Sequence, residues 1–248
     1  MAVMETKNGT HIYTWNEKKV PGVTTITNIV NKPFLVKWAY NLGKNGVDMD
    51  AQSRQTLNIG KLVHSMIQSY FEKSNSSTID NEVFDGISDI ETTHAKRCFR
   101  KFLNWSSQHT IKPILLETSL VNNLYGGTFD ALLDIDGKIV LMDWKTSNTI
   151  YPEYFAQVSA YWGLISQHKQ EDDRVEELIR NNRVETIAVF RMPKDDLEDA
   201  PLRDDNWDIV EIAVDSHDFS IAYQYFYSCL RLYQSKSELE KNLGGNRN

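Results

Sequence analysis

The stretch that decides the fold is "GGTFDALLDIDGKIVLMDWKTS", residues 126–147. Two apolar runs, 127–134 and 138–146, flank the pair Asp136-Gly137, a pattern typical of a tight β-hairpin. An EF-hand calcium loop counted from Asp134 would need an Asp or Asn at its fifth position and a Glu at its twelfth. The chain has Lys138 and Lys145 there instead. We therefore predict two antiparallel strands joined by a turn.

The second strand of this hairpin ends in charged residues. Side chains alternate between the two faces of a strand, so Asp143 and Lys145 point to the same side as Leu141. Counting outward from the turn places Asp130 level with Asp143. The hairpin is therefore expected to bring two carboxylates and an ammonium group together at its open end.

Such a cluster is costly unless a cation offsets it, because neighbouring carboxylates repel and raise each other's pKa. Carboxylate oxygens favour Mg²⁺ or Mn²⁺ over zinc or copper. The pattern therefore predicts a divalent metal site. An Asp–Lys ion pair at the end of a strand is the alternative interpretation.

Two pairs outside the hairpin have a helical spacing of four residues. Gly60 and His64 lie at the expected start of a helix, and Gln157 and Tyr161 lie in a helix that follows Pro152. His64 is a candidate site residue, with a buried core histidine as the alternative. Gln157 and Tyr161 are candidates for supporting the site, with a purely structural pair as the alternative.

The rest of the chain alternates between helical and extended patterns. Residues 23–30, "VTTITNIV", fit either a strand, because they are rich in β-branched residues, or a short helix. The interleaving predicts one α/β domain with a central mixed sheet flanked by helices. We expect this domain over residues 1–242, with a helical N-terminal elaboration and a disordered tail at 243–248. Helices are expected at 47–73, 88–108, from 152 for about four turns, 172–182 and 216–241, and strands at 10–15, 112–121, 127–134, 138–146, 183–192 and 207–214.

Composition limits the functional classes. The chain has 248 residues, 41% of them hydrophobic, without an apolar run long enough to span a membrane, so a soluble cytoplasmic protein with no membrane partner is expected. Only two cysteines, Cys98 and Cys229, are present, which excludes an iron–sulfur cluster held by four cysteines.

The net charge of −7 argues against a partner bound by bulk electrostatics, such as DNA. However, the acidic residues concentrate at 171–177 and 195–208, whereas a predicted helix carries Lys96, Arg97, Arg100 and Lys101 on one side. Arg97 and Arg100 are therefore candidates for contacting a nucleic-acid backbone. A solvated helix face is the alternative.

Taken together, the ordered motifs Gly60-xxx-His64, Gly127-Thr-Phe-Asp130, Asp143-Trp-Lys145-Thr and Gln157-xxx-Tyr161 resemble those of the PD-(D/E)XK nuclease superfamily, in its RecB-like branch. Residues 20–38 are similar to the opening segment of phage exonucleases of this superfamily and of the mitochondrial genome-maintenance exonuclease. The resemblance covers about residues 20 to 165. Gly22 departs from the serine that is usual in those relatives.

The resemblance implies a restriction-endonuclease-like core and a Mg²⁺- or Mn²⁺-dependent DNA exonuclease, encoded by a phage or mobile element and serving DNA recombination, repair or degradation. DNA would be its partner, with single strands as one candidate form. An endonuclease of the same fold and a catalytically silent module that binds DNA or protein remain alternatives. Implied site residues are Asp130, Asp143 and Lys145 for catalysis; His64, Asp130, Asp143 and the Trp144 carbonyl for the metal; and Gln157, Tyr161 and Glu117 for support of the site or contact with nucleic acid.

Overall fold

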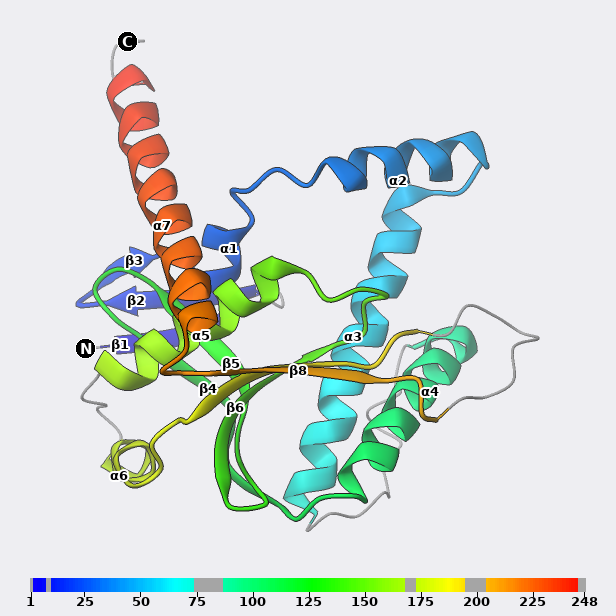
Figure 1. The fold of residues 1–248 in the computed structure, drawn as a ribbon. Coiled ribbons are helices and arrows are strands. Elements are labelled where there is room, and N and C mark those ends of the chain that lie inside the picture. The colour runs from blue at the N-terminus through cyan, green and yellow to red at the C-terminus, as the bar shows by residue number, and fades with distance from the viewer. Residues whose placement is uncertain (1, 8–9, 74–86, 168–172, 195–203, 245–248) are drawn as a thin grey trace.

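A five-stranded mixed sheet forms the centre of the molecule (Figure 1). The computed structural model describes residues 2–7, 10–73, 87–167, 173–194 and 204–244. The strand order is β4-β5-β6-β7-β8, and every pairing is antiparallel except β6–β7. The predicted α/β class with a central mixed sheet is confirmed. The strands are β4 (Ile111–Val121), β5 (Gly126–Ile135), β6 (Lys138–Lys145), β7 (Thr186–Arg191) and β8 (Asp208–Ala213).

The hairpin β5–β6 confirms the expected turn and register. Asp136 and Gly137 both have positive φ angles, 54° and 87°, which is the backbone of a type I′ turn. Glycine adopts this conformation without a steric penalty. The strand pairing runs from Ile135 opposite Lys138 to Ala131 opposite Met142. The next two residues outward are Asp130 and Asp143, so the predicted level of the two carboxylates is confirmed.

Helices cover both faces of the sheet and bury two apolar clusters. On one face, α3 (Met49–Glu72) and α4 (Asp89–Ser106) pack against Val140, Met142 and Trp144. On the other face, α1 (Val23–Thr27), α5 (Pro152–Gln167) and α7 (His217–Gly244) pack against Leu141 and its neighbours. The alternation of β6 between these two clusters is the one that its sequence predicts. A further short helix, α6 (Asp173–Asn181), lies before β7.

The N-terminal part contains strands as well as helices. β1 (Ala2–Lys7), β2 (Thr10–Trp15) and β3 (Lys18–Val20) form a separate antiparallel sheet beside β4 and β5. Residues 23–27, for which the sequence allowed a strand or a helix, form α1. Val23 and Ile26, three residues apart, are both buried against the second cluster, so tertiary burial decides against the local β propensity.

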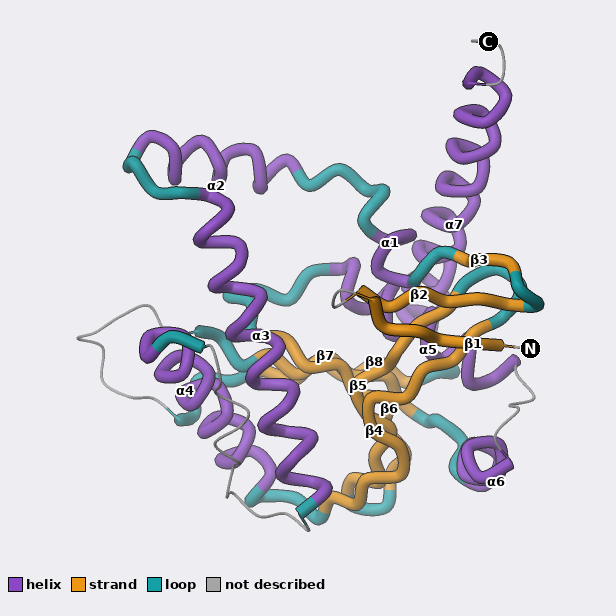
Figure 2. The backbone as a smooth tube through the Cα atoms, turned by 180° about the vertical axis from the view of Figure 1, so that it is seen from behind, coloured by secondary structure: helices purple, strands orange, loops and turns teal. Residues whose placement is uncertain are grey.

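Helix α2 (Pro33–Lys44) stands away from the central sheet and turns into the N-terminal end of α3 (Figures 1 and 2). At the other terminus, α7 extends through Gly244, so residues 243–244 of the predicted disordered tail are helical. Residues 245–248 lie outside the described residues. Within the described part of the chain, no helix combines the length and the hydropathy needed to cross a lipid bilayer.

Two details of the helices correct the sequence analysis. Gly60 and His64 lie in the middle of α3, not at its start, because the helix begins at Met49 with Asp48 as its N-cap. Lys101 was expected on the basic side of the helix predicted at 88–108, which is α4. It is 1% exposed and donates a hydrogen bond of 2.6 Å to the Pro193 carbonyl. Burial of this side chain between α4 and the segment after β7 explains the error.

The two motif glycines differ in what surrounds them, which gives a prediction about stability. A Cβ at position 127 would lie 2.5 Å from the ring of Tyr161, whereas one at position 60 would have its nearest neighbour, Thr146 Oγ1, at 3.7 Å. We expect Gly127→Ala to lower the free energy of unfolding by about 1–3 kcal/mol through overpacking. Gly60→Ala should raise it by up to about 1 kcal/mol, because alanine is the better helix former. Urea unfolding checks both, and equal effects of the two substitutions would contradict this account.

Candidate active site

The candidate site lies where β6 ends and β5 begins, beside the middle of α3. A cavity of about 710 Å³ opens there. Its walls come from α3, the N-terminal sheet and the ends of the central strands, so segments far apart in sequence enclose it. The lining includes His11, Gly60, Lys61, His64, Gln68, Glu117, Thr128, Trp144, Lys145, Tyr154 and Lys194.

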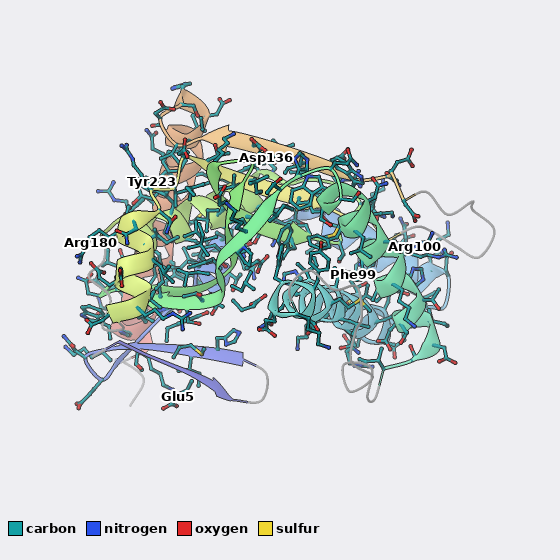
Figure 3. All side chains as sticks on the ribbon, turned by 90° about the horizontal axis from the view of Figure 1, so that it is seen from below. Glu5, Phe99, Arg100, Asp136, Arg180 and Tyr223 are labelled. Atoms are coloured by element: carbon teal, nitrogen blue, oxygen red, sulfur yellow. The ribbon has the colours of Figure 1, made fainter. Side chains whose placement is uncertain are left out.

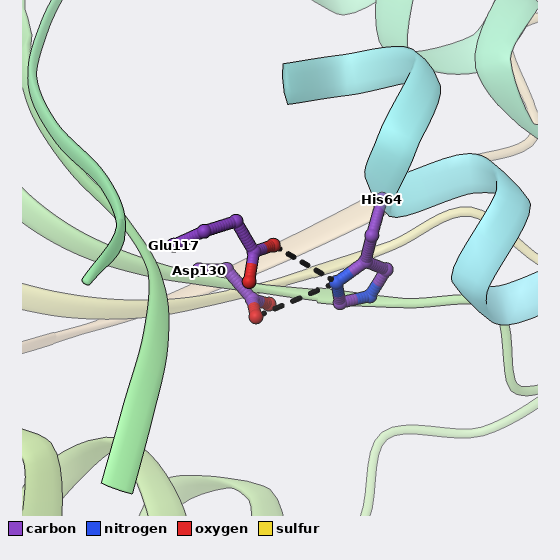
Figure 4. A group of neighbouring side chains, drawn as sticks. All are labelled: His64, Glu117 and Asp130. Atoms are coloured by element: carbon purple, nitrogen blue, oxygen red, sulfur yellow. Dashed lines mark ion pairs between the residues drawn. The ribbon is translucent and has the colours of Figure 1, made fainter. Parts of the chain in front are cut away.

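His64 and Glu117, which line this cavity, converge with Asp130 from α3, β4 and β5 (Figure 4). Nδ1 of His64 lies 3.4 Å from Oδ1 of Asp130 and 3.7 Å from Oε1 of Glu117. One potential ligand atom from each of the three lies within 4.8 Å of the others. Two carboxylates and an imidazole at such separations can share one divalent cation.

The backbone of β6 fixes two of these side chains. The Trp144 amide donates a hydrogen bond of 2.7 Å to Oδ2 of Asp130, which leaves Oδ1 facing His64. Nε2 of His64 lies 3.1 Å from the Trp144 carbonyl oxygen. An N–H at Nε2 donated to this carbonyl turns Nδ1 toward the carboxylates, the orientation in which a histidine offers one nitrogen to a metal and anchors the other.

Glu117 reaches the site through an unusual backbone conformation. Its φ angle is 41°, in the left-handed region that a non-glycine residue rarely adopts. A conformation of this kind costs on the order of 1–3 kcal/mol and concentrates at functional sites. The sequence flagged Glu117 through its position on the preceding strand, but this local distortion has no signature in the sequence.

Asp143 and Lys145 form a second, more deeply buried pair. Asp143 is 1% exposed, and the Nζ of Lys145 lies 2.6 Å from its Oδ2, although that oxygen has no well-oriented hydrogen bond. The same ammonium group lies 5.0 Å from the centre of the Tyr154 ring, as a cation–π contact. Lys145 thus extends from a buried carboxylate to the wall of the cavity.

The contacts among these charged side chains shift the pKa values of His64, Asp130 and Asp143. Burial disfavours protonation of His64, but the charge of Asp130 and hydrogen bonding to Asp130 and Glu117 outweigh it and raise the pKa of His64 to about 10. Burial alone would raise the pKa of Asp130, yet His64 and Lys145 hold it below its usual value. Burial raises the pKa of Asp143 to about 6 against the effect of Lys145. The two aspartates are therefore held in different electrostatic environments.

Lys145 remains an ammonium group in this arrangement. Burial favours its neutral form, but the nearby Asp143 and Asp130 carboxylates raise the pKa of Lys145 above its ordinary value. Its charge is therefore available in the cavity at neutral pH.

Gln157 and Tyr161 lie behind this cluster. Nε2 of Gln157 donates a hydrogen bond of 2.8 Å to the Tyr161 hydroxyl, and Tyr161 is 4% exposed. Its ring occupies the space that a side chain at Gly127 would need. The two residues are brought beside the site, where they support the β5 backbone just before Asp130.

Arg97 and Arg100 lie elsewhere. Arg100 pairs with Asp204 at 2.7 Å, and Figure 3 shows it on the side of α4 away from Phe99, which packs into the core. Neither arginine is among the described residues that line the cavity. A role for them on nucleic acid remains a prediction.

Tyr154, Lys61 and Lys194 also line the cavity, and the sequence analysis missed them. Tyr154 lies three residues before Gln157 and seven before Tyr161, so helical spacing would have identified it. Lys61 lies within the Gly60-xxx-His64 motif, directly after Gly60. Lys194 enters the cavity through the segment after β7, where the Met192 amide donates a hydrogen bond of 2.7 Å to the Lys145 carbonyl, a contact between distant segments.

Comparisons with known proteins do not assign the chain to a family. No family model matches the chain, and no curated protein matches it. Among solved structures, an alkaline exonuclease (LHK-Exo) from Laribacter hongkongensis aligns with a TM-score of 0.31 and 12% sequence identity, over 77% of this chain and 93% of that one. LHK-Exo in complex with dAMP aligns with a TM-score of 0.30 and 14% identity over the same shares. A likeness at this level assigns neither a family nor an activity to the chain.

The His64 environment predicts a pH dependence of stability in the metal-free protein. A histidine whose pKa is about 6.5 when unfolded and about 10 when folded stabilises the folded state fully below pH 6.5. That contribution is lost as the pH rises from 6.5 to 10. In EDTA, the advantage of the wild type over His64→Gln in the free energy of unfolding should therefore shrink across this range. A difference independent of pH would show that His64 is not held protonated.

Proposed function

We propose that the chain is a metal-dependent nuclease that hydrolyses phosphodiester bonds of DNA, and that it acts as an exonuclease. The observation that carries the proposal is the convergence of His64, Glu117 and Asp130 beside the Asp143–Lys145 pair, at a cavity that His64, Glu117 and Lys145 line. The motif resemblance supports the nuclease assignment, and the similarity of residues 20–38 to phage exonucleases supports the exonuclease form and a phage or mobile-element origin.

The residues fit a divalent cation. Asp130 and Glu117 supply hard oxygen ligands and His64 supplies a nitrogen, while Asp143 adds a buried carboxylate with an oxygen that lacks a well-oriented hydrogen bond. Mg²⁺ and Mn²⁺ both accept carboxylates, and an imidazole ligand is more compatible with Mn²⁺. Because His64 is protonated without metal, binding of the cation at Nδ1 would release a proton.

When bound, such a cation lowers the pKa of a water molecule and offsets charge on a phosphoryl oxygen. The chain itself supplies the positioning. Asp130 and Glu117 hold the ligand geometry, Asp143 fixes Lys145, and the Lys145 ammonium faces the cavity where a scissile phosphate would carry its growing negative charge. Because its pKa is raised, Lys145 is better suited to stabilise charge than to accept a proton from water.

Lys145 gives the most direct test of the proposed nuclease. We expect Lys145→Ala to slow hydrolysis by about 100-fold or more, because removing one preorganised charge typically costs this much. Affinity for DNA should change little. The measurement is release of nucleotides from 5′- and 3′-labelled single- and double-stranded DNA with Mg²⁺, Mn²⁺ or EDTA.

Wild-type release from one end with metal, lost in the variant, supports the exonuclease and gives its polarity. Internal cuts would favour an endonuclease. DNA binding without hydrolysis under any of the metals would favour a silent binding module.

The metal ligands give a second test. Asp130→Asn and Glu117→Gln should each weaken Mn²⁺ binding by about tenfold or more, measured by titration calorimetry without DNA. Asp136→Asn is a matched control, because Asp136 also pairs with a histidine, His109, at 2.7 Å, but on the hairpin turn away from the cavity. Equal losses in all three variants would contradict the assigned site.

A further inference from the structure

Helix α2 presents an exposed surface that the proposed active site does not use. Val36 and Tyr40 are each 69% exposed, and Lys37 and Lys44 are also exposed. Relative to Tyr40 these residues lie at i−4, i−3 and i+4, so all four share one face of the helix. We call this set, Val36, Lys37, Tyr40 and Lys44, the α2 face. Exposed apolar and aromatic side chains gathered in this way mark a binding surface.

The charge around the α2 face is unlike that of the chain as a whole. The protein has a net charge of −7, yet residues 18–47 contain five lysines and no aspartate or glutamate. Lys32, at the N-cap of α2, adds to the two lysines of the face. An aromatic ring between lysines suits a strand of nucleic acid, since bases stack on the ring and ammonium groups contact phosphates. A second copy of this acidic chain is the other occupant, which the sedimentation measurement below tests.

The α2 face is connected to the cavity through α3. Thr56, Leu57, Lys61, His64 and Gln68 line the cavity from successive turns of α3, so that wall runs from the site toward the helix N-terminus. At that end the chain turns back into α2 (Figures 1 and 2). From His64 to Met49 is fifteen residues, or about 22 Å along the helix axis. A single strand that runs from the site to the α2 face must span more than this distance.

We propose that the α2 face is a secondary binding site for single-stranded nucleic acid, which holds the substrate several nucleotides from the scissile phosphate. The identity of the scissile phosphate rests on the proposed nuclease function, whereas binding at the α2 face does not. Substrates shorter than this spacing do not reach the α2 face, and longer substrates do.

The experiment compares the oligonucleotides (dT)4 and (dT)20 on the full chain. Fluorescence anisotropy in EDTA measures binding between 50 and 200 mM salt, and hydrolysis with Mn²⁺ is measured separately. Tyr40→Ala should weaken (dT)20 binding by about fivefold or more through lost stacking, and Tyr40→Phe should restore it. Neither change should alter hydrolysis of (dT)4.

Charge reversal gives an independent readout. The double variant Lys37→Glu, Lys44→Glu should reduce the slope of log affinity against log salt for (dT)20 by about 1.4, or 0.7 for each lost phosphate contact. The matched control Lys236→Glu, Lys241→Glu places the same charge change on exposed positions of α7 and should leave the slope unchanged.

Unchanged (dT)20 affinity and slope in the α2 variants, with hydrolysis by the wild type intact, would overturn the inference and leave the nuclease assignment standing. Loss of (dT)20 binding in the α2 variants, together with no hydrolysis by the wild type, would support the inference and overturn the nuclease assignment. Absence of (dT)20 binding by the wild type overturns the inference. So does sedimentation that shows a wild-type dimer dissociated by Tyr40→Ala while (dT)20 binding is unchanged, since the α2 face would then bind a second copy.

Discussion

The register of the β5–β6 hairpin is the constraint on which the site depends. Because side chains alternate with a period of two, a slip of one residue would move Asp143 and Lys145 to the opposite face and Trp144 into their place. The type I′ turn at Asp136-Gly137 prevents the slip, and the apolar alternation of both strands reinforces it. The bond from the Trp144 amide to Asp130 then extends the pairing past the last backbone partners. In this way the strand pairing itself orients one carboxylate of the candidate site.

The second determinant is how the buried charges are balanced. Asp130 faces His64, and Asp143 contacts Lys145, so each aspartate has its own cationic neighbour. Glu117 adds a third carboxylate close to His64, through a backbone conformation that disfavours folding. Three carboxylates against two cationic groups leave an excess of negative charge beside one cavity, which a divalent cation would stabilise. A fold selected only for stability would have replaced these groups with apolar side chains.

The walls of the cavity and the core come from partly different segments. The central sheet, α3 and α4 enclose an aromatic cluster that fixes Trp144, while the N-terminal sheet adds an outer wall to the cavity. Two basic residues of α4 already have partners within the chain. Lys101 donates a hydrogen bond to the Pro193 carbonyl, and Arg100 pairs with Asp204. Residues 18–47, with five lysines and no aspartate or glutamate, are basic within an otherwise acidic chain. Net charge is therefore a poor guide to partners when the charges are segregated along the sequence.

The sequence by itself determined the features that rest on local patterns. The Asp-Gly turn and period-two alternation gave the hairpin, the level of Asp130 and Asp143, and the shared face of Asp143 and Lys145, because each depends only on residues a few positions apart. The helices at 49–72, 89–106 and 152–167 followed from their apolar spacing in the same way.

Tertiary structure alone decided the rest. Local propensity allowed residues 23–30 a strand, but burial of Val23 and Ile26 against α5 and α7 made α1 helical. Lys101 had the spacing of a surface residue, and packing between α4 and the segment after β7 buried it. The approach of Glu117 to His64, of Lys145 to Tyr154 and of Lys194 to the cavity joins residues from different elements. These contacts depend on how the helices and strands pack in space, and no periodicity within one segment encodes that packing.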